Sequence, residues 1–560
     1  MDTSETKICQ ACKQNFTIAP EDFEFYKKIN VPAPTWCPDC RMMRRFQFRN
    51  ERTWYKGTCA ATGKSILSMF RPDSGYTVYD LNYWKSDAWD PLEYAMDYDL
   101  NKPFFDQFGE LLKRIPHANL IQKNNVNSDY TNCTLNLKNC YYCASVDPGE
   151  DSAYCFGAVL GVRSSLDIHL SNESEQSYQL VDCNRSSRLR LSQACESCLD
   201  SWFLYDCRNC SNCVGCAGLR NKQYCIFNEQ YTKDEYTKKL QELSLDSYSG
   251  LEAVRVKFEE LKKSVPRKFA SITRSENAIG EDIIGSKNVI GFSVKDGSEN
   301  VRYSYRVVGS SDIYDSFTAW NGAELEYETL SCSAQRIAFS CYIWGGFDIQ
   351  YSYNCYDSNN LFGCANLRNK SYCILNKQYS KEEYEKLLPK IIEQMKKAGE
   401  YGEFFPSTIA PFCYNETISQ DYFPLTKEKA QALGYRWQDS SAKTHQVSMS
   451  TDQIPDKIEA ITDGILKEVI ACEHSNANCN EQCAGAFKLI PMELQYYRQW
   501  GVPLPRLCPS CRHFGRVKQK PPLSLRDGAC AKCSASFKTA YPLDTPYKLY
   551  CEQCYNAEIA

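Results

Sequence analysis

Two stretches of the chain repeat an aromatic or aliphatic position at an interval of 24 residues. In the first stretch these positions are Tyr130, Tyr154, Tyr178, Trp202 and Ile226. In the second they are Ile279, Tyr303, Tyr327, Tyr351 and Leu375. A fixed period of this size is typical of stacked repeats, and the short alternating runs between the positions are typical of strands. The pattern predicts a mainly β protein with a duplicated parallel β-solenoid of about 24 residues per coil.

The two predicted solenoids align directly near their ends. Segment 216–236, CAGLRNKQYCIFNEQYTKDEY, matches segment 364–384, CANLRNKSYCILNKQYSKEEY, at an offset of 148. Each copy then enters a predicted helix through a capping box, Thr232 with Glu235 and Ser380 with Glu383. The amphipathic stretch 101–115 predicts a further helix. Because the open end of a β-coil exposes unpaired backbone groups, we expect these helices to act as caps.

Pairs of cysteines mark both ends of the chain. Each end carries two pairs with 24 residues between them, and an offset of 471 superposes the two ends well beyond the cysteines. Four thiolates arranged in this way bind one Zn²⁺ in a closed, structural site. The predicted ligands are Cys9, Cys12, Cys37 and Cys40 at the N-terminal end, and Cys479, Cys483, Cys508 and Cys511 at the C-terminal end. Cys472 and His474 are alternatives to Cys479.

A second ribbon follows the first at each end. In the C-terminal module it is complete, with Cys530, Cys533, Cys551 and Cys554. The same positions of the N-terminal module are Cys59, Thr62, Asp80 and Tyr83, which do not bind zinc tightly. We expect this degenerate ribbon to be held by the packing of Phe70, Tyr76, Tyr79 and Trp84. The sequence thus predicts three structural zinc ions.

Composition supports metal binding in a reducing compartment. The chain has 560 residues, 32 cysteines, five histidines and a net charge of -4. Its start lacks the pattern of a secretory signal, and no apolar run is long enough to cross a membrane. We therefore expect a cytoplasmic protein, in which cysteines act as metal ligands or buried thiols rather than as disulfides.

A run of cysteines in the first predicted solenoid has the spacing of an iron–sulfur motif. Its members are Cys195, Cys198, Cys207, Cys210, Cys213 and Cys216. In the second copy, Ser358 and Leu361 replace Cys210 and Cys213. Positions that accept such residues are typical of small buried sites. We interpret the run mainly as buried thiols, with an extra zinc site or an iron–sulfur cluster as alternatives.

Basic residues follow the second cysteine pair of each module. They are Arg41, Arg44, Arg45, Arg49 and Arg52 in the N-terminal module, and Arg512, Arg516 and Lys518 in the C-terminal one. Guanidinium groups interleaved with aromatic rings can bind phosphates and stack on bases, so an exposed patch would bind RNA or DNA. The alternative is that these arginines pair with the acidic stretch 80–106 of the same module.

The sequence contains no recognisable catalytic constellation. There is no phosphate-binding Gly loop, nucleophile elbow or HExxH pair, and the acidic segment 147–151 is typical of a turn. The prediction is a non-enzymatic protein with no evident small-molecule substrate and no membrane partner.

Four segments are informative when they are taken together. They are VPAPTWCPDCRMMRRFQFRNER, TGKSILSMFRPDSGYTVYDLNYWKSDAWDP, LRNKQYCIFNEQYTKDEY and PLPRLCPSCRHFGRVKQ. They resemble a family of zinc-ribbon, Cys-rich repeat proteins from reduced-genome candidate-phyla bacteria of the Patescibacteria type. The resemblance spans nearly the whole chain. It implies zinc ribbons and assigns no activity.

These patterns predict six segments. They are an N-terminal double ribbon (1–84), a capping helix region (85–117), two solenoids each followed by a helix (118–266 and 267–398), a linker with short helices (399–470) and a C-terminal double ribbon (471–560). Within the linker, the sequence predicts one helix over TKEKAQALG from residue 426 and another over DKIEAITDGILKEVI from residue 456. The predicted function is a zinc-binding architectural scaffold that binds nucleic acid or a ribonucleoprotein through its ribbons. A protein-binding or self-assembling scaffold and an iron–sulfur redox protein are the alternatives.

Overall fold

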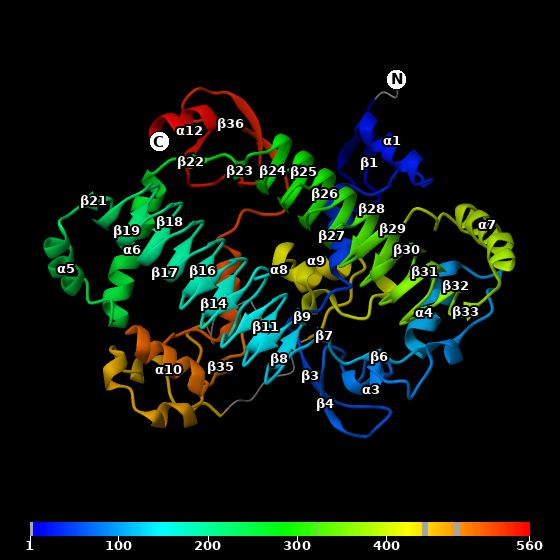
Figure 1. Cartoon of the computed structure of the whole chain (residues 1–560), viewed down its shortest axis with the longest axis horizontal. Helices are drawn as coiled ribbons and strands as arrows, with labels where there is room; N and C mark the ends of the chain where they lie inside the picture. Colours follow the sequence, from blue (N-terminus) through cyan, green and yellow to red (C-terminus); the bar gives the residue numbers. More distant parts are fainter. Residues whose placement is uncertain (1–3, 321, 440–445, 475–481, 560) are drawn as a thin grey trace.

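The computed structural model describes residues 4–320, 322–439, 446–474 and 482–559. Two parallel β-sheets of eleven strands each form its centre (Figure 1). The first sheet contains β10 (Leu137–Lys138), β12 (Gly149–Glu150), β13 (Val162–Arg163), β14 (Leu166–His169), β15 (Ser174–Glu175), β16 (Tyr178–Val181), β17 (Ser187–Gln193), β18 (Leu199–Tyr205), β19 (Ser211–Ala217), β20 (Gln223–Ile226) and the antiparallel β21 (Glu229–Gln230). Two parallel pairs precede it, β7 (Gln122–Lys123) with β9 (Thr134–Leu135) and β8 (Asp129–Asn132) with β11 (Tyr141–Ala144).

The second sheet has longer strands. They are β23 (Ile272–Thr273), β24 (Glu276–Ile284), β25 (Lys287–Lys295), β26 (Glu299–Val308), β27 (Ser311–Trp320), β28 (Glu324–Leu330), β29 (Ser333–Cys341), β30 (Trp344–Gln350), β31 (Tyr356–Phe362), β32 (Ser371–Ile374) and the antiparallel β33 (Lys377–Gln378). The prediction of a mainly β protein with cysteine clusters near both ends is confirmed.

The strand register of the first sheet advances by 12 residues at most steps and by 13 between β12 and β13, not by the expected 24. Tyr178 pairs with Arg190, and Arg190 pairs with Trp202. The aromatic series therefore marks every second strand, which explains why it has twice the true step. In the second sheet the step varies between 11 and 13 residues, as between Ile279, Ile290 and Arg302.

A left-handed backbone conformation recurs at every third residue along much of both sheets. Between residues 200 and 212, φ lies between 48° and 53° at Asp200, Phe203, Asp206, Asn209 and Asn212. This conformation is costly for residues other than glycine, and asparagine and aspartate tolerate it best. The positions between them that face the interior also repeat every third residue, and most are small: Cys195, Cys198, Ser201, Cys207 and Cys210 are buried, together with the larger Leu204.

Interior serines and cysteines satisfy the backbone of these short segments. The Ser186 hydroxyl donates to the carbonyl of Asn184 at 3.0 Å and accepts from the amide of Cys198 at 3.2 Å. The Cys198 thiol in turn donates to the carbonyl of Glu196 at 3.5 Å. A small polar side chain thus meets the hydrogen-bonding needs of a buried backbone where a larger one would not fit.

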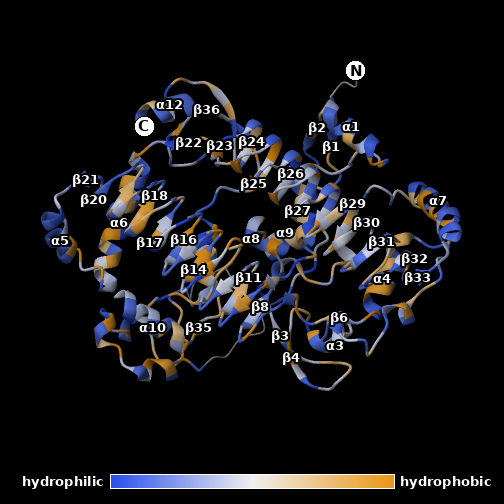
Figure 2. Cartoon of the chain, viewed as in Figure 1, coloured by the Kyte–Doolittle hydropathy of each residue, from blue (hydrophilic) through white to orange (hydrophobic). Residues whose placement is uncertain are grey.

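Helices cover the ends of the sheets. They are α4 (Phe104–Arg114), α5 (Lys233–Glu242), α6 (Tyr248–Ser264) and α7 (Lys381–Ala398), and both predicted capping boxes are present. Figure 2 shows hydrophobic positions on α4 and α6. Phe258 of α6 packs on Phe203 of the first sheet, with ring centroids 5.8 Å apart. Phe104 of α4 packs on Tyr351 and Phe362, so α4 caps the second sheet although it precedes the first in the chain.

The terminal modules repeat one arrangement. The first ribbon of the N-terminal module consists of β1 (Glu5–Ile8), β2 (Asn15–Ile18), α1 (Pro20–Lys28) and α2 (Pro38–Phe46). The first ribbon of the C-terminal module consists of β34 (Ile470–Ala471), β35 (Ala486–Phe487), α10 (Pro491–Trp500) and α11 (Pro509–Val517). The second ribbon of the N-terminal module consists of β3 (Tyr55–Thr58), β4 (Ser65–Ser68), β5 (Val78–Tyr79) and α3 (Leu81–Lys85). The second ribbon of the C-terminal module consists of β36 (Arg526–Ala529), β37 (Ser536–Thr539), β38 (Leu549–Tyr550) and α12 (Glu552–Ile559). Strand β5 pairs with β6 (His117–Ala118), and β38 pairs in the same way with β22 (Arg267–Lys268).

The connector between the second sheet and the last module is only partly helical. Helix α8 (Ile418–Tyr422) lies between the two sheets, and α9 (Lys427–Ala432) is the short helix predicted near 426 (Figure 1). The helix predicted from residue 456 is wrong, because the chain there forms 3₁₀ turns. The 3₁₀ helices are η1 (Pro91–Tyr94), η2 (Ser407–Ile409), η3 (Tyr414–Glu416), η4 (Thr451–Gln453), η5 (Ile458–Ala460) and η6 (Asp463–Lys467). None of the helices in the described residues is long and apolar enough to cross a membrane.

Candidate metal centres and the buried arginine contacts

Three groups of four cysteines bring their thiols together among the described residues. They are Cys9, Cys12, Cys37 and Cys40; Cys472, Cys483, Cys508 and Cys511; and Cys530, Cys533, Cys551 and Cys554. Within each group all four sulfur atoms lie within 4.8 Å of one another. A tetrahedral zinc with Zn–S bonds of about 2.3 Å requires S···S separations of about 3.8 Å. The separations of 3.8 Å for Cys12 and Cys37 and 3.6 Å for Cys533 and Cys551 fit that geometry.

The first group is built from a hairpin end and a helix start. Cys9 directly follows β1, Cys37 is the N-cap residue of α2, and Cys40 lies in its first turn. The amide of Cys37 donates to Cys9 Sγ at 3.2 Å. Pro38 at the first helical position needs no amide partner and fixes the helix start next to the thiols.

In the C-terminal module Cys472 occupies the place of Cys9. It directly follows β34, and the amide of Cys508 donates to its sulfur at 3.2 Å, the same contact as in the first module. The predicted ligand Cys479 lies outside the described residues. Cys472, which the sequence offers as an alternative to Cys479, is the fourth thiol of the group with Cys483, Cys508 and Cys511. Spacing alone pointed to Cys479 because the segment between the first two ligands is longer here than between Cys9 and Cys12.

Each group favours at least one thiolate. A hydrogen bond from the Cys40 thiol lowers the pKa of Cys37 to about 5. A hydrogen bond from Cys472 is the main reason that the pKa of Cys508 is lowered, to about 2. At Cys530 desolvation raises the pKa, but the amides of Cys551 and Cys533 outweigh it and lower the pKa to about 6. Thiolate is the form that binds metal.

In the degenerate ribbon, Cys59 Sγ accepts from the amide of Asp80 at 3.2 Å. Phe70 and Trp84 are buried, and Tyr76 and Tyr79 pack on the same hydrophobic core. The packing predicted for this ribbon is therefore confirmed.

The arginines predicted to form an exposed basic patch are buried, so that expectation is wrong. Arg41, Arg44, Arg45, Arg49, Arg52, Arg512 and Arg516 each expose 7% or less of their surface. The physical reason is that α2, the chain just after it, and α11 turn their basic side chains toward the sheets, where carboxylates neutralise them. Lys518 is exposed. The alternative, in which these arginines pair with the acidic segment 80–106, is also wrong for the seven arginines. The carboxylates that they contact lie outside that segment.

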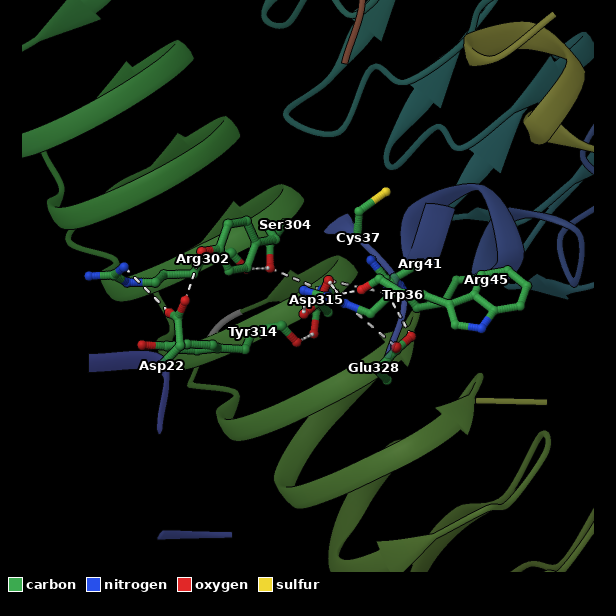
Figure 3. Close-up of polar contacts among 12 residues, drawn as sticks. Asp22, Trp36, Cys37, Arg41, Arg45, Arg302, Ser304, Tyr314, Asp315 and Glu328 are labelled. Carbon is green, nitrogen blue, oxygen red and sulfur yellow. Dashed lines mark hydrogen bonds and ion pairs between the residues drawn. The ribbon is translucent and has the colours of Figure 1, made fainter. Parts of the chain in front are cut away.

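Arg41 and its neighbours on α2 bind two acids of the second sheet and one acid, Glu403, of the chain after α7. Arg41 Nε and Nη2 donate to the carboxylate of Asp315 in β27 at 3.0 and 2.8 Å. Arg45 Nη1 lies 2.6 Å from Glu328 of β28, and Arg44 bridges Glu328 and Glu403 at 3.2 and 2.8 Å. Figure 3 shows Arg41 and Arg45 directed at the carboxylates of Asp315 and Glu328. Asp315 and Glu328 are fully enclosed.

Helix α11 repeats this contact on the first sheet. Arg516 Nη1 donates to Asp167 of β14 at 2.7 Å, and Arg512 Nε lies 3.3 Å from the same carboxylate. Asp167 is 148 positions before Asp315, the offset between the two sheet sequences. Arg512 and Arg516 are 471 positions after Arg41 and Arg45. The first ribbon of each end thus docks on the sheet farther from it in the sequence.

A tyrosine on each sheet adds a second matching contact. Tyr303 donates to Asp22 of α1 at 2.8 Å, and Tyr154 donates to Glu493 of α10 at 2.9 Å. Glu493 also accepts from Arg512 at 3.2 Å. We call the ion pairs of α2 and α11 with the sheets, together with these tyrosine contacts, the arginine clamps. Their acidic partners were not predicted. Combining the 148 and 471 offsets would have aligned Asp167 with Asp315 and Asp22 with Glu493.

Arg49 and Arg52 lie between the two sheets. Arg49 donates to Glu51 at 2.5 Å and to Ser145 of the first sheet region at 2.8 Å. It also donates to Ser331 of the second sheet region. Arg52 donates to Asp421 of α8 at 3.0 Å. Both arginines therefore join parts of the fold.

The six cysteines of the iron–sulfur-like run are buried inside the first sheet structure. The thiols of Cys207, Cys210, Cys213 and Cys216 donate to carbonyls two residues earlier at 3.3 to 3.5 Å. None of the six belongs to a group of metal-ligating side chains within the described ranges. Their geometry supports the interpretation as buried thiols.

Comparison with known proteins gives no match to this chain: no protein-family model, no curated protein and no solved structure is similar to it.

Proposed function

We propose that this protein is a non-enzymatic, zinc-stabilised scaffold in which metal-bound terminal ribbons lock two β-solenoids together. The observation that carries the proposal is the position of Arg41 directly after Cys40, and of Arg512 directly after Cys511. In each ribbon the side chain that enters the sheet follows a metal ligand on the same helix. Metal binding would fix the helix and thereby the arginine.

The strand register supports the solenoid part of the proposal. A chain in which consecutive strands pair in parallel at a 12-residue step, with a turn at every third residue, describes a narrow coil. Its interior accepts only small or slender side chains, which accounts for the buried cysteines and serines. Structural zinc supplies folding free energy that short ribbons lack.

All three thiol groups have the donor set and spacing that suit Zn²⁺. When bound, the ion would contribute a closed tetrahedral site and no reactive position. The described cysteines are free thiols, which fits a reducing, cytoplasmic setting.

A protein partner, or a second copy of the chain, is favoured over nucleic acid. The seven arginines proposed to bind phosphate are buried, and the contacts described above hold all seven of them against carboxylates. Binding of RNA or DNA to exposed basic side chains would weaken steeply with salt. We expect the native protein to show no salt-sensitive binding of single-stranded RNA or DNA in fluorescence anisotropy.

Hydrogen exchange tests the proposal in variants that each lack one predicted metal ligand. It measures whether the metal-bound ribbons stabilise the sheets on which they dock. Cys40→Ser should reduce protection of β26, β27 and β28 in the second sheet, whereas Cys511→Ser should reduce protection of β14 and β16 in the first. Cys210→Ser, which changes a buried thiol outside the metal groups, is the matched control and should leave both regions protected. Loss of protection confined to each altered ribbon, with both sheets unchanged, would contradict the proposal.

A further inference from the structure

A cavity of about 260 Å³ lies between the two sheets and belongs to neither the metal groups nor the arginine clamps of α2 and α11. Leu135, Val146 and Val159 line it from the first sheet region. Trp320, Tyr342 and Trp344 line it from the second. Its wall is therefore largely aliphatic and aromatic, as in sites that bind small organic molecules.

Arg306 is the unusual residue of this wall. It exposes 9% of its surface, and none of the described residues places a carboxylate within 4.0 Å of it. Its Nη2 atom donates to the hydroxyl of Tyr422 at 3.1 Å, while its Nε atom has no partner among the described protein atoms. A buried guanidinium with an unused donor favours an acceptor that carries negative charge.

Two further groups in the cavity wall also lack partners in the described chain, and both can donate. They are the hydroxyl of Thr318 and the indole nitrogen of Trp320. Arg49, the other guanidinium in the wall, already donates to Glu51. Lys123 is exposed to solvent, and the half-buried Asp147 accepts from the side-chain amide of Asn136 at 2.8 Å. Arg306 is the buried guanidinium of the wall that has no carboxylate in direct contact among the described residues.

The first sheet leaves room for this arginine. Gly157 has a φ of +71°, and a Cβ atom there would lie 2.9 Å from Arg306 Nη2. A larger residue at this position would therefore displace the guanidinium. Glycine avoids this clash, and it adopts the left-handed conformation without the cost that other residues bear.

We propose that this cavity binds a small aromatic carboxylate. The carboxylate would accept from Arg306, Thr318 and Trp320, and the ring would pack among the aromatic and aliphatic side chains. Because the site joins residues of both sheets, the ligand would bind across their interface. This site is separate from the proposed scaffold function and does not depend on metal.

Titration calorimetry and tryptophan fluorescence with benzoate test the site, since Trp320 and Trp344 lie in its wall. Benzoate should bind the native protein, and its neutral counterpart benzamide should bind at least tenfold more weakly. Arg306→Gln should weaken benzoate at least tenfold, and Thr318→Val should weaken it several-fold. Arg336→Gln alters an exposed, paired arginine of the same sheet and should leave binding unchanged.

Absence of benzoate binding at millimolar concentration would overturn the proposal. So would equal binding of benzoate and benzamide, or binding of inorganic phosphate without benzoate, because the aromatic wall would then have no role. If Arg306→Gln does not fold, the benzoate–benzamide difference and Thr318→Val still decide the question. Benzoate binding that survives Thr318→Val unchanged and matches benzamide refutes the site.

Discussion

Arg41 of helix α2 and Asp315 of strand β27 form a buried two-point ion pair, with N···O distances of 3.0 and 2.8 Å, although 274 residues separate them in the chain. The guanidinium and the carboxylate are both almost completely enclosed. Arg512 and Asp167 form the corresponding pair in the other half of the molecule at 3.3 Å. The two ends of the chain are thus fastened by equivalent contacts to opposite sheets.

Removal of the Asp315 charge should strongly destabilise the fold. Asp315→Asn leaves Arg41 and Arg45 with an unbalanced buried charge, which costs about 3–5 kcal/mol when one partner of a buried pair is lost. Chemical denaturation should detect this as a lower midpoint. Asp348→Asn breaks the exposed pair with Arg336 and should cost less than about 1 kcal/mol. Equal effects of the two substitutions would show that the buried pair has no special role.

The interior of the first sheet should accept serine but not a large side chain. Cys210 aligns with Ser358 of the second sheet, and its thiol donates to the carbonyl of Arg208 at 3.3 Å. Cys210→Ser keeps this donor and should change stability by less than about 1 kcal/mol. Cys210→Phe should cost about 1–3 kcal/mol or more through overpacking. Thermal unfolding measures both, and tolerance of Phe would refute a narrow interior.

Glu326 should make stability depend on pH. It is fully buried, and desolvation raises the pKa of its carboxyl from 4.5 to about 7. Between these values the unfolded chain releases the proton while the folded chain keeps it, so the free energy of unfolding falls as pH rises. The total loss is about 3 kcal/mol, from about 1.4 kcal/mol per pKa unit.

Glu326→Gln tests that dependence, since the amide does not ionise. The variant should match the native protein near pH 4.5 and exceed its stability by about 3 kcal/mol at pH 8. Denaturant titrations at both pH values provide the measurement. A difference between the two proteins that does not vary with pH would contradict the assignment.

The local features of the fold could be predicted from the sequence. Cysteine pairs identified the three thiol groups because each pair is formed by neighbours in the chain, and the capping boxes identified α5 and α7 for the same reason. Cys472 was only an alternative, because a longer segment separates it from Cys483. The 12-residue step was missed because large aromatic residues stand out at twice that interval.

Features that depend on distant contacts could not be predicted in the same way. The arginines of α2 resembled a nucleic-acid patch because the acids that bury them, such as Asp315, lie more than 250 residues away. Ile454, Ile458, Ile461 and Ile465 are spaced like the apolar residues on one face of a helix. These isoleucines instead come from 3₁₀ turns and intervening chain that pack in one hydrophobic cluster with Leu494 and Tyr497 of α10.

The metal content of the intact protein tests the central claim most directly. Elemental analysis of the purified, unchelated chain should find three zinc ions per molecule, one for each group of four cysteines. Cys511→Ser should reduce the number to two. A native protein without zinc, or one whose zinc content is unchanged in that variant, would contradict an account in which metal-bound ribbons lock the two sheets.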